Sequence, residues 1–174
     1  MTDKELSVIL RASAVEHGLC DEWRNEWKDN STPQELINKY LRGMDFALAN
    51  HWPSNDFIKE NFNKDILIKN NIIVDMKRSV LNPRICVVLG SSEVNIRLNS
   101  QHPSVIYIRD TAHVTIYVHT AEKVIVHVFE NARIEVLPGE IYTPDILILQ
   151  HSMGAMIKAP VHVKVVKDLD YLKD

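Results

Sequence analysis

The sequence predicts an α+β protein in which an N-terminal helical bundle is followed by a small parallel β-solenoid. Residues 1–62 carry helix-start signals and apolar residues at helical spacing, whereas residues 93–138 carry apolar residues at every second position. That alternation returns in the same phase every ten residues, which indicates an internal repeat. We therefore expect a helical head at 1–62, a joint with the first rung at 63–90, and a β-repeat domain with a C-terminal cap at 91–174.

The helical head begins with a Thr and a Glu three residues apart, at Thr2 and Glu5. In such a capping box the Thr side chain accepts a bond from the backbone of the Glu, and the Glu reaches back to the backbone of the Thr. The same pair recurs at Thr32 and Glu35, with a proline at the first helical position, and predicts a helix through residue 48 that is weakened by Gly43. Trp23 and Trp27 are expected to share one helix face and to pack in the core.

The repeat region is expected to bury one side of every strand. Its joins at 109–113, 119–123 and 129–133 contain Asp, Thr, Asn and Ala but no glycine. Tight hairpins favour glycine because their turns need a positive φ, so these joins favour stacked parallel coils of two or three strands each. An antiparallel meander or sandwich stays open as the alternative, because a longer hairpin loop could use the same residues. The expected inward residues are Val94, Ile96, Leu98, Ile106, Ile108, Val114, Ile116, Val118, Val124, Val126, Val128, Ile134 and Val136.

The outward positions of the repeat include several large side chains, which supply the candidate binding residues. They fit an ordinary ladder of β-forming residues, or else a contact surface with an apolar patch. We predict an interaction face made of Tyr107, Tyr117, Ile125, His127 and Leu137.

Composition excludes some classes of protein. The chain has 174 residues, a net charge of −3 and a pI near 6.2, which argues against a nucleic-acid partner. It holds no apolar run long enough to span a membrane, and its first residues lack the basic start of a signal peptide, so we expect a cytoplasmic or virion-associated protein. Cys20 and Cys86 are expected to be free thiols rather than a disulfide.

No catalytic motif is apparent, and we expect no cofactor. His113, His119 and His127 fall at different register positions, so they do not converge as metal ligands would, and no metal site is predicted. Carboxylates are too sparse on the outward positions to form the cluster that a hydrolase on a solenoid needs. The least favoured alternative is a hydrolase acting through Glu135 and His127.

The chain resembles uncharacterised proteins of gut Bacteroidetes and their phages, which have a helical head followed by ten-residue β-repeats. The resemblance rests on Gly18-Leu19-Cys20, on Pro53-Ser54-Asn55, on Asn82-Pro83-Arg84 and on Asn131-Ala132-Arg133-Ile134. The repeat unit of such proteins is similar to Asn-Ala-x-Val, of which this chain keeps the first half at Asn131. The resemblance implies the layout and offers no activity.

These observations predict a non-enzymatic structural or interaction module, a helix-capped β-repeat scaffold. We expect it to associate with itself or to bind another protein, without nucleic-acid or membrane partners. The alternative is a phage-related carbohydrate- or cell-surface-binding module, in which Tyr107 and Tyr117 stack on sugars.

Overall fold

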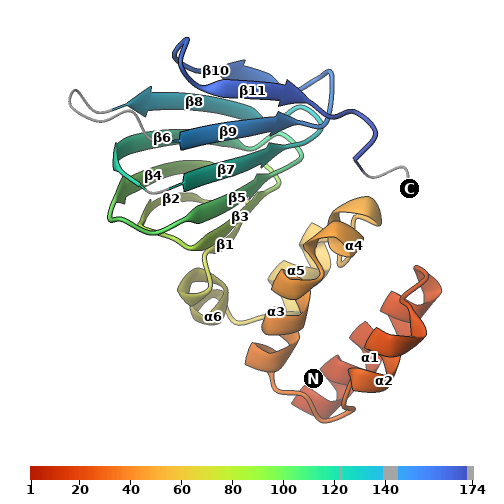
Figure 1. Cartoon of the computed structure of the whole chain (residues 1–174). Coiled ribbons are helices and arrows are strands. Elements are labelled where there is room, and N and C mark those ends of the chain that lie inside the picture. The colour runs from red at the N-terminus through yellow and green to blue at the C-terminus, as the bar shows by residue number, and fades with distance from the viewer. Residues whose placement is uncertain (122, 139–144, 172–174) are drawn as a thin grey trace. The chain divides into compact units, whose positions relative to one another are not determined.

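The structure, a computed structural model, describes residues 1–121, 123–138 and 145–171. The chain divides into two compact units, one of helices and one of strands, with the division after Leu67 (Figure 1). The helices are α1 (Asp3–Glu16), α2 (Asp21–Glu26), α3 (Pro33–Arg42), α4 (Met44–Ala49), α5 (Asn55–Asn61) and α6 (Lys64–Lys69).

Both predicted capping boxes are present. Thr2 accepts a hydrogen bond from the backbone N–H of Glu5, and the Glu5 carboxylate accepts one from the backbone N–H of Thr2 at 2.7 Å. Thr32 and Glu35 make the same pair at the start of α3. These bonds satisfy N–H groups that a helix leaves without an intrahelical partner, so α1 and α3 begin where the sequence indicates.

The helix expected over residues 33–48 is divided in two at Gly43. Gly43 has φ −102° and ψ 35°, and it ends α3 and precedes α4. A β-carbon at this residue would lie 3.0 Å from the ring of Trp23. The missing side chain therefore allows an indole to pack against the backbone at the break, which the helical spacing of the apolar residues does not reveal.

The two tryptophans of the α2 region do not share a helix face. α2 ends at Glu26, and Trp27 has extended backbone angles. Its ring is buried, its Nε1–H donates to the Ser7 hydroxyl at 3.0 Å, and its centroid lies 6.3 Å from that of Trp52. Trp23 stays half-buried, with the Arg42 guanidinium 5.2 Å from its ring. The early end of α2 separates the two indoles, so Trp27 alone enters the core.

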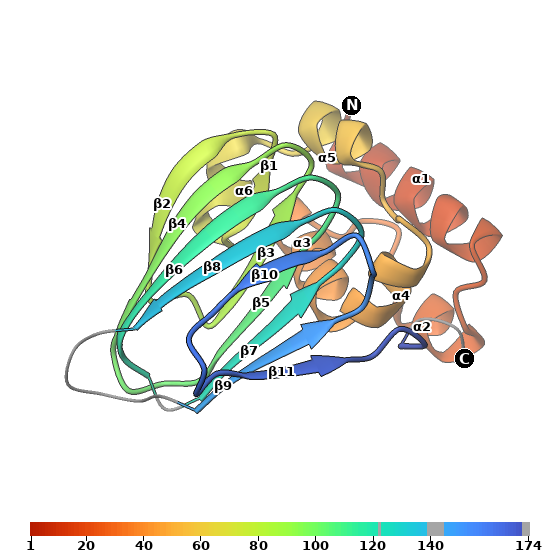
Figure 2. The ribbon, with the colours of Figure 1, turned by 90° about the horizontal axis from the view of Figure 1, so that it is seen from above.

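The strands form two parallel sheets, as the glycine-free joins predict. The six-stranded sheet has the order β1-β3-β5-β7-β9-β11 and the five-stranded sheet the order β10-β8-β6-β4-β2 (Figure 2). Every pairing between these strands is parallel. The chain thus alternates between the sheets and winds as a β-solenoid of about four turns. The strands are β1 (Ile72–Val74), β2 (Lys77–Leu81), β3 (Ile85–Leu89), β4 (Glu93–Asn99), β5 (Ser104–Ile108), β6 (His113–Thr120), β7 (Lys123–Val128), β8 (Arg133–Pro138), β9 (Asp145–Gln150), β10 (Met156–Lys158) and β11 (Lys164–Lys167).

One coil takes about twenty residues, which is two of the ten-residue units. Val94 pairs with Val114, and Val114 with Ile134. All three are nearly inaccessible to solvent, and the other expected inward residues of the repeat lie with them in one core. Burial of this aliphatic stack is the main favourable contribution to the stability of the solenoid.

The corner that leaves the six-stranded sheet repeats its geometry from coil to coil. Gly90, Asp110 and Glu130 stand two residues beyond Val88, Ile108 and Val128, which pair with one another, and all three have positive φ. A positive φ turns the chain sharply. Small side chains then point into the core at Ser92, Ala112, Ala132 and Ala155, where a larger one would meet the stacked aliphatic residues.

Candidate functional site

The five residues of the predicted interaction face lie on two sheets. Tyr107 (β5), Ile125 and His127 (β7) belong to the six-stranded sheet, whereas Tyr117 (β6) and Leu137 (β8) belong to the five-stranded sheet. Consecutive ten-residue units alternate between the sheets, so outward residues that are ten apart in sequence lie on opposite faces. The structure therefore does not bring these five side chains together on one surface.

The same topology separates Glu135 from His127. Glu135 points outward from β8 in one sheet, and His127 lies on the outer side of β7 in the other. The buried core of the solenoid lies between them. A general acid and a general base must both reach the reacting group, so this pair cannot act as the catalytic pair of a hydrolase.

The outer face of the five-stranded sheet, here called the five-stranded face, presents polar side chains in three rows across the strands. Parallel pairing in register places equivalent residues of successive coils side by side. The first row is Lys77, Glu93, His113, Arg133 and Met156; the second is Ser79, Asn95, Thr115, Glu135 and Lys158; the third is Leu81, Arg97, Tyr117 and Leu137.

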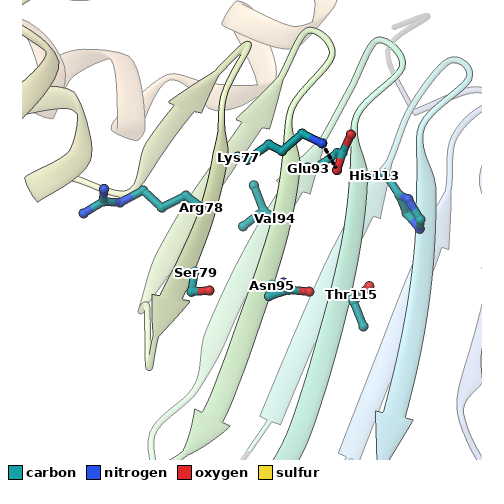
Figure 3. Close-up of a pocket in the computed structure, with 8 residues that line it drawn as sticks. All are labelled: Lys77, Arg78, Ser79, Glu93, Val94, Asn95, His113 and Thr115. Atoms are coloured by element: carbon teal, nitrogen blue, oxygen red, sulfur yellow. Dashed lines mark ion pairs between the residues drawn. The ribbon is translucent and has the colours of Figure 1, made fainter.

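A shallow hollow of about 530 Å³ lies over β2, β4 and β6 on this face. Figure 3 shows Ser79, Asn95 and Thr115 side by side below the Lys77–Glu93 ion pair, with the His113 ring beside the pair and Arg78 directed away from it. A second hollow, of about 370 Å³, shares Glu93 and His113 and extends toward Arg133. The first row thus follows an open, polar depression along successive coils.

The charges of the five-stranded face are unevenly distributed. Lys77 pairs with Glu93 at 2.9 Å, and Lys158 pairs with Glu135. Arg97 and Arg133 form no ion pair with any residue that the structure describes. Four cationic side chains therefore face two carboxylates on this surface, although the whole chain carries a net charge of −3. Such a local excess of positive charge attracts anions.

The six-stranded sheet carries a different feature, an aromatic cluster at the ends of its strands. Tyr107 stacks on His127 with ring centroids 4.8 Å apart, and the His151 ring lies 4.5 Å from Phe129 and 4.2 Å from Tyr171. The side chain of His151 is only 2% exposed, and His127 is 8% exposed. This cluster is largely closed to ligands, so it is less suited to binding than the five-stranded face.

The two histidines of this cluster are hydrogen-bonded to each other. His127 Nδ1 lies 3.0 Å from His151 Nε2, and His151 Nδ1 lies 2.9 Å from the backbone oxygen of Asp168. Burial lowers the pKa of His151, and the bond to the Asp168 backbone and the charge of its carboxylate oppose this only in part. The sequence did point to His127, whereas Phe129, His151 and Tyr171 were missed. The backbone N–H of Phe129 donates to the Ile108 oxygen, and that of His151 donates to the Val128 oxygen. Phe129 and His151 therefore take equivalent places in successive coils.

Fold and site together define a β-solenoid protein in which six helices precede the solenoid in the sequence and one sheet face is polar and rich in cations. No family model, no curated protein and no solved structure matches the chain. The resemblance to proteins of gut Bacteroidetes and their phages therefore stays a prediction. Across the part of the chain that the structure describes, no helix combines the length and the hydrophobicity needed to cross a bilayer.

Proposed function

We propose that this protein is a non-enzymatic binding module whose contact surface is the five-stranded face. The observation that carries this proposal is the alignment of polar and charged side chains in rows that continue from coil to coil. Adjacent strands in a sheet lie about 4.8 Å apart, so each row offers hydrogen-bonding groups at a regular interval. A ligand with its own repeating polar groups can contact several rungs at once.

The ligand class that this face suits best is an acidic polysaccharide. Arg97 and Arg133 offer guanidinium groups, which bind carboxylates through two parallel hydrogen bonds. Asn95 and Thr115 supply the amide and hydroxyl groups that sugar hydroxyls need. The half-buried ring of Tyr117 pairs in register with Arg97 and Leu137, where it can pack against the apolar side of a sugar.

Isothermal titration calorimetry with oligogalacturonate tests this proposal, with neutral dextran oligosaccharides as the comparison ligand. We expect the wild-type protein to bind oligogalacturonate more tightly than dextran. The double variant Arg97→Gln/Arg133→Gln is expected to lose about a hundredfold or more in affinity, because each lost charge-assisted bond contributes about 1.5–3 kcal/mol.

The matched control is Arg84→Gln/Lys164→Gln, which removes the same charge from two exposed residues outside the five-stranded face. It is expected to bind like wild type. Equal losses in both double variants would mean that overall charge determines binding. Absence of wild-type binding would remove the acidic polysaccharide as the ligand class.

A second candidate function, self-association, is supported by the last coil. Met153, Met156, Val161 and Val165 are 69%, 50%, 105% and 44% exposed, so apolar side chains concentrate at this end. β10 and β11 are also the last strands of their sheets and leave one backbone edge unpaired among the described strands. A second copy brings an identical edge and identical apolar groups, which suits a two-fold interface.

Sedimentation velocity at several concentrations tests self-association. We expect wild type to dimerise and Met156→Lys/Val165→Lys to remain monomeric. The control is Leu81→Lys, which changes an exposed apolar residue on β2, at the opposite edge of the five-stranded sheet from Met156. It is expected to behave like wild type. A wild-type protein that stays monomeric at all concentrations would contradict this candidate.

A further inference from the structure

The segment that follows β11 packs on the outer side of the six-stranded sheet. Its Tyr171 ring lies 5.4 Å from His127, 6.2 Å from Phe129 and 4.2 Å from His151, measured between centroids. The backbone of the same segment accepts a bond from His151 at Asp168. The Asp168 N–H in turn donates to the Gln150 oxygen at 2.9 Å. The position of this segment therefore depends on the two histidines.

The hydrogen bonds fix which nitrogen carries each proton. A carbonyl oxygen only accepts, so His151 must hold a proton on Nδ1 to bond Asp168. In neutral His151 the other nitrogen, Nε2, is then an acceptor, and His127 must donate to it from Nδ1. This arrangement requires no charge on either ring, and the three nitrogens that make these two bonds, His127 Nδ1, His151 Nε2 and His151 Nδ1, are matched as donors and acceptor.

Protonation changes this match. A proton on His151 Nε2 can be kept only if His127 gives up its own Nδ1 proton and becomes the acceptor. When both rings are charged, two N–H groups point at each other across 3.0 Å, and two positive rings lie with centroids 5.2 Å apart in a buried place. Like charges at this separation, with neither ring solvated, strongly disfavour the closed arrangement.

We propose that His127 and His151 form a pH-sensitive latch that holds residues 168–171 on the six-stranded sheet at neutral pH and releases them in acid. Release removes Tyr171 from the cluster and exposes the ring faces of Phe129 and His127. The latch is independent of the five-stranded face, because it lies on the opposite sheet.

Asp168 is the acid whose charge acts on His151. The Asp168 carboxylate lies with Oδ2 3.9 Å from His151 Nδ1, and its side chain is 40% exposed. β5 contributes the phenol ring of Tyr107, and the segment contributes that of Tyr171. Arg109, two coils before His151 at the same corner, is cationic and is paired with Asp110 at 3.3 Å. The partly solvated Asp168 carboxylate can offset a proton on His151, but it cannot restore the hydrogen bond between the two rings once both facing nitrogens carry a proton.

Hydrogen–deuterium exchange of the full chain, followed by mass spectrometry at about pH 7.5 and about pH 5, tests the latch. Exchange times are scaled for the intrinsic effect of pH. We expect exchange in peptides covering 164–171 to rise about tenfold in acid, the effect of losing roughly one buried hydrogen bond, while peptides of β6 stay unchanged. Absence of this local rise would overturn the proposal.

Two variants separate the latch from other acid effects. His127→Phe/His151→Phe keeps aromatic rings and removes both titrating groups, so its acid response is expected to disappear. His162→Gln changes an exposed histidine near the same segment and is expected to keep the full response. An unchanged response in the double variant would assign the effect elsewhere and overturn the latch.

A measurement on the wild type covers the case in which the double variant does not fold. NMR titration of the histidine ring signals is expected to show one member of the pair taking up its proton below the ordinary value of 6.5. That step is expected to coincide with the rise in exchange at 164–171. Two independent titrations near the ordinary value, with no link to exchange, would overturn the proposal.

Discussion

Gly90 sits directly against the carboxylate of Asp75, the residue at the equivalent corner one coil earlier. A β-carbon on Gly90 would lie 2.0 Å from Asp75 Oδ1, and the φ of Gly90 is +68°. The same Oδ1 accepts a bond from the Ser91 N–H at 2.8 Å, and the Gly90 N–H donates to the Asp110 carboxylate. Side-chain carboxylates thus connect three successive coils through this corner, and only a glycine leaves space for them.

We expect Gly90→Ala to destabilise the solenoid by about 2 kcal/mol or more, because it adds backbone strain and displaces a hydrogen-bonded carboxylate. Urea denaturation measures the free energy of unfolding. In the background of Asp75→Ala the same substitution is expected to cost less, since the displaced group is gone. Equal costs in both backgrounds would show that the contact between Gly90 and Asp75 has no energetic effect.

The register of the strands can be tested at two neighbouring residues of β6. Ile116 is 1% exposed and points into the core, while Thr115 lies on the five-stranded face. Ile116→Ala is expected to cost about 2–5 kcal/mol because it leaves a cavity in the aliphatic stack. Thr115→Ala is expected to cost less than about 1 kcal/mol. Similar costs in denaturant titrations of the two variants would contradict this register.

The solenoid could be predicted because its core repeats a simple pattern. The alternation through Val114, Ile116 and Val118 marks one buried side, and glycine-free joins favour parallel coils. The absence of glycine from the joins does not, however, exclude a positive φ. Asp110 and Glu130 adopt φ of 63° and 53°, so positive φ does occur at these corners without glycine. The repetition of the corner along stacked coils, with cross-coil bonds such as that of Asp110, supports a conformation that these residues rarely adopt alone.

The candidate site was harder to predict than the fold. A period of two identifies the outward residues but does not say how many strands make one coil. Tyr107 and Tyr117 therefore seemed to be neighbours, although a coil of two strands sends them to opposite sheets. His151 could not be placed from the sequence for a related reason. Val126 and Ile148 pair in register, but the coil between them is two residues longer than the coil before it. His151 therefore falls out of phase with the ten-residue repeat.

The second capping box makes the stability of α3 depend on pH. Hydrogen bonds from the backbone and side chain of Thr32 lower the pKa of Glu35 below its ordinary value of 4.5. A lowered pKa in the folded state means that the box stabilises the fold above pH 4.5 and that this contribution is lost as the pH falls through the folded pKa. Thermal melts followed by circular dichroism are expected to show less acid sensitivity for Glu35→Gln than for wild type. An identical acid response in the two proteins would contradict the role of this box.

The two cysteines are expected to differ sharply in reactivity. Cys86 is fully buried in the solenoid core, and burial raises the pKa of its thiol to about 12, whereas Cys20 is exposed. Only the thiolate is a good nucleophile, so iodoacetamide at about pH 8 is expected to modify Cys20 quickly and Cys86 only after unfolding. Mass spectrometry of the native protein should therefore show one adduct, and of the denatured protein two. Cys20→Ser provides the control, because it should show none while folded. Rapid labelling of folded Cys20→Ser would mean that the coils around Cys86 open readily, and it would contradict the closed core described above.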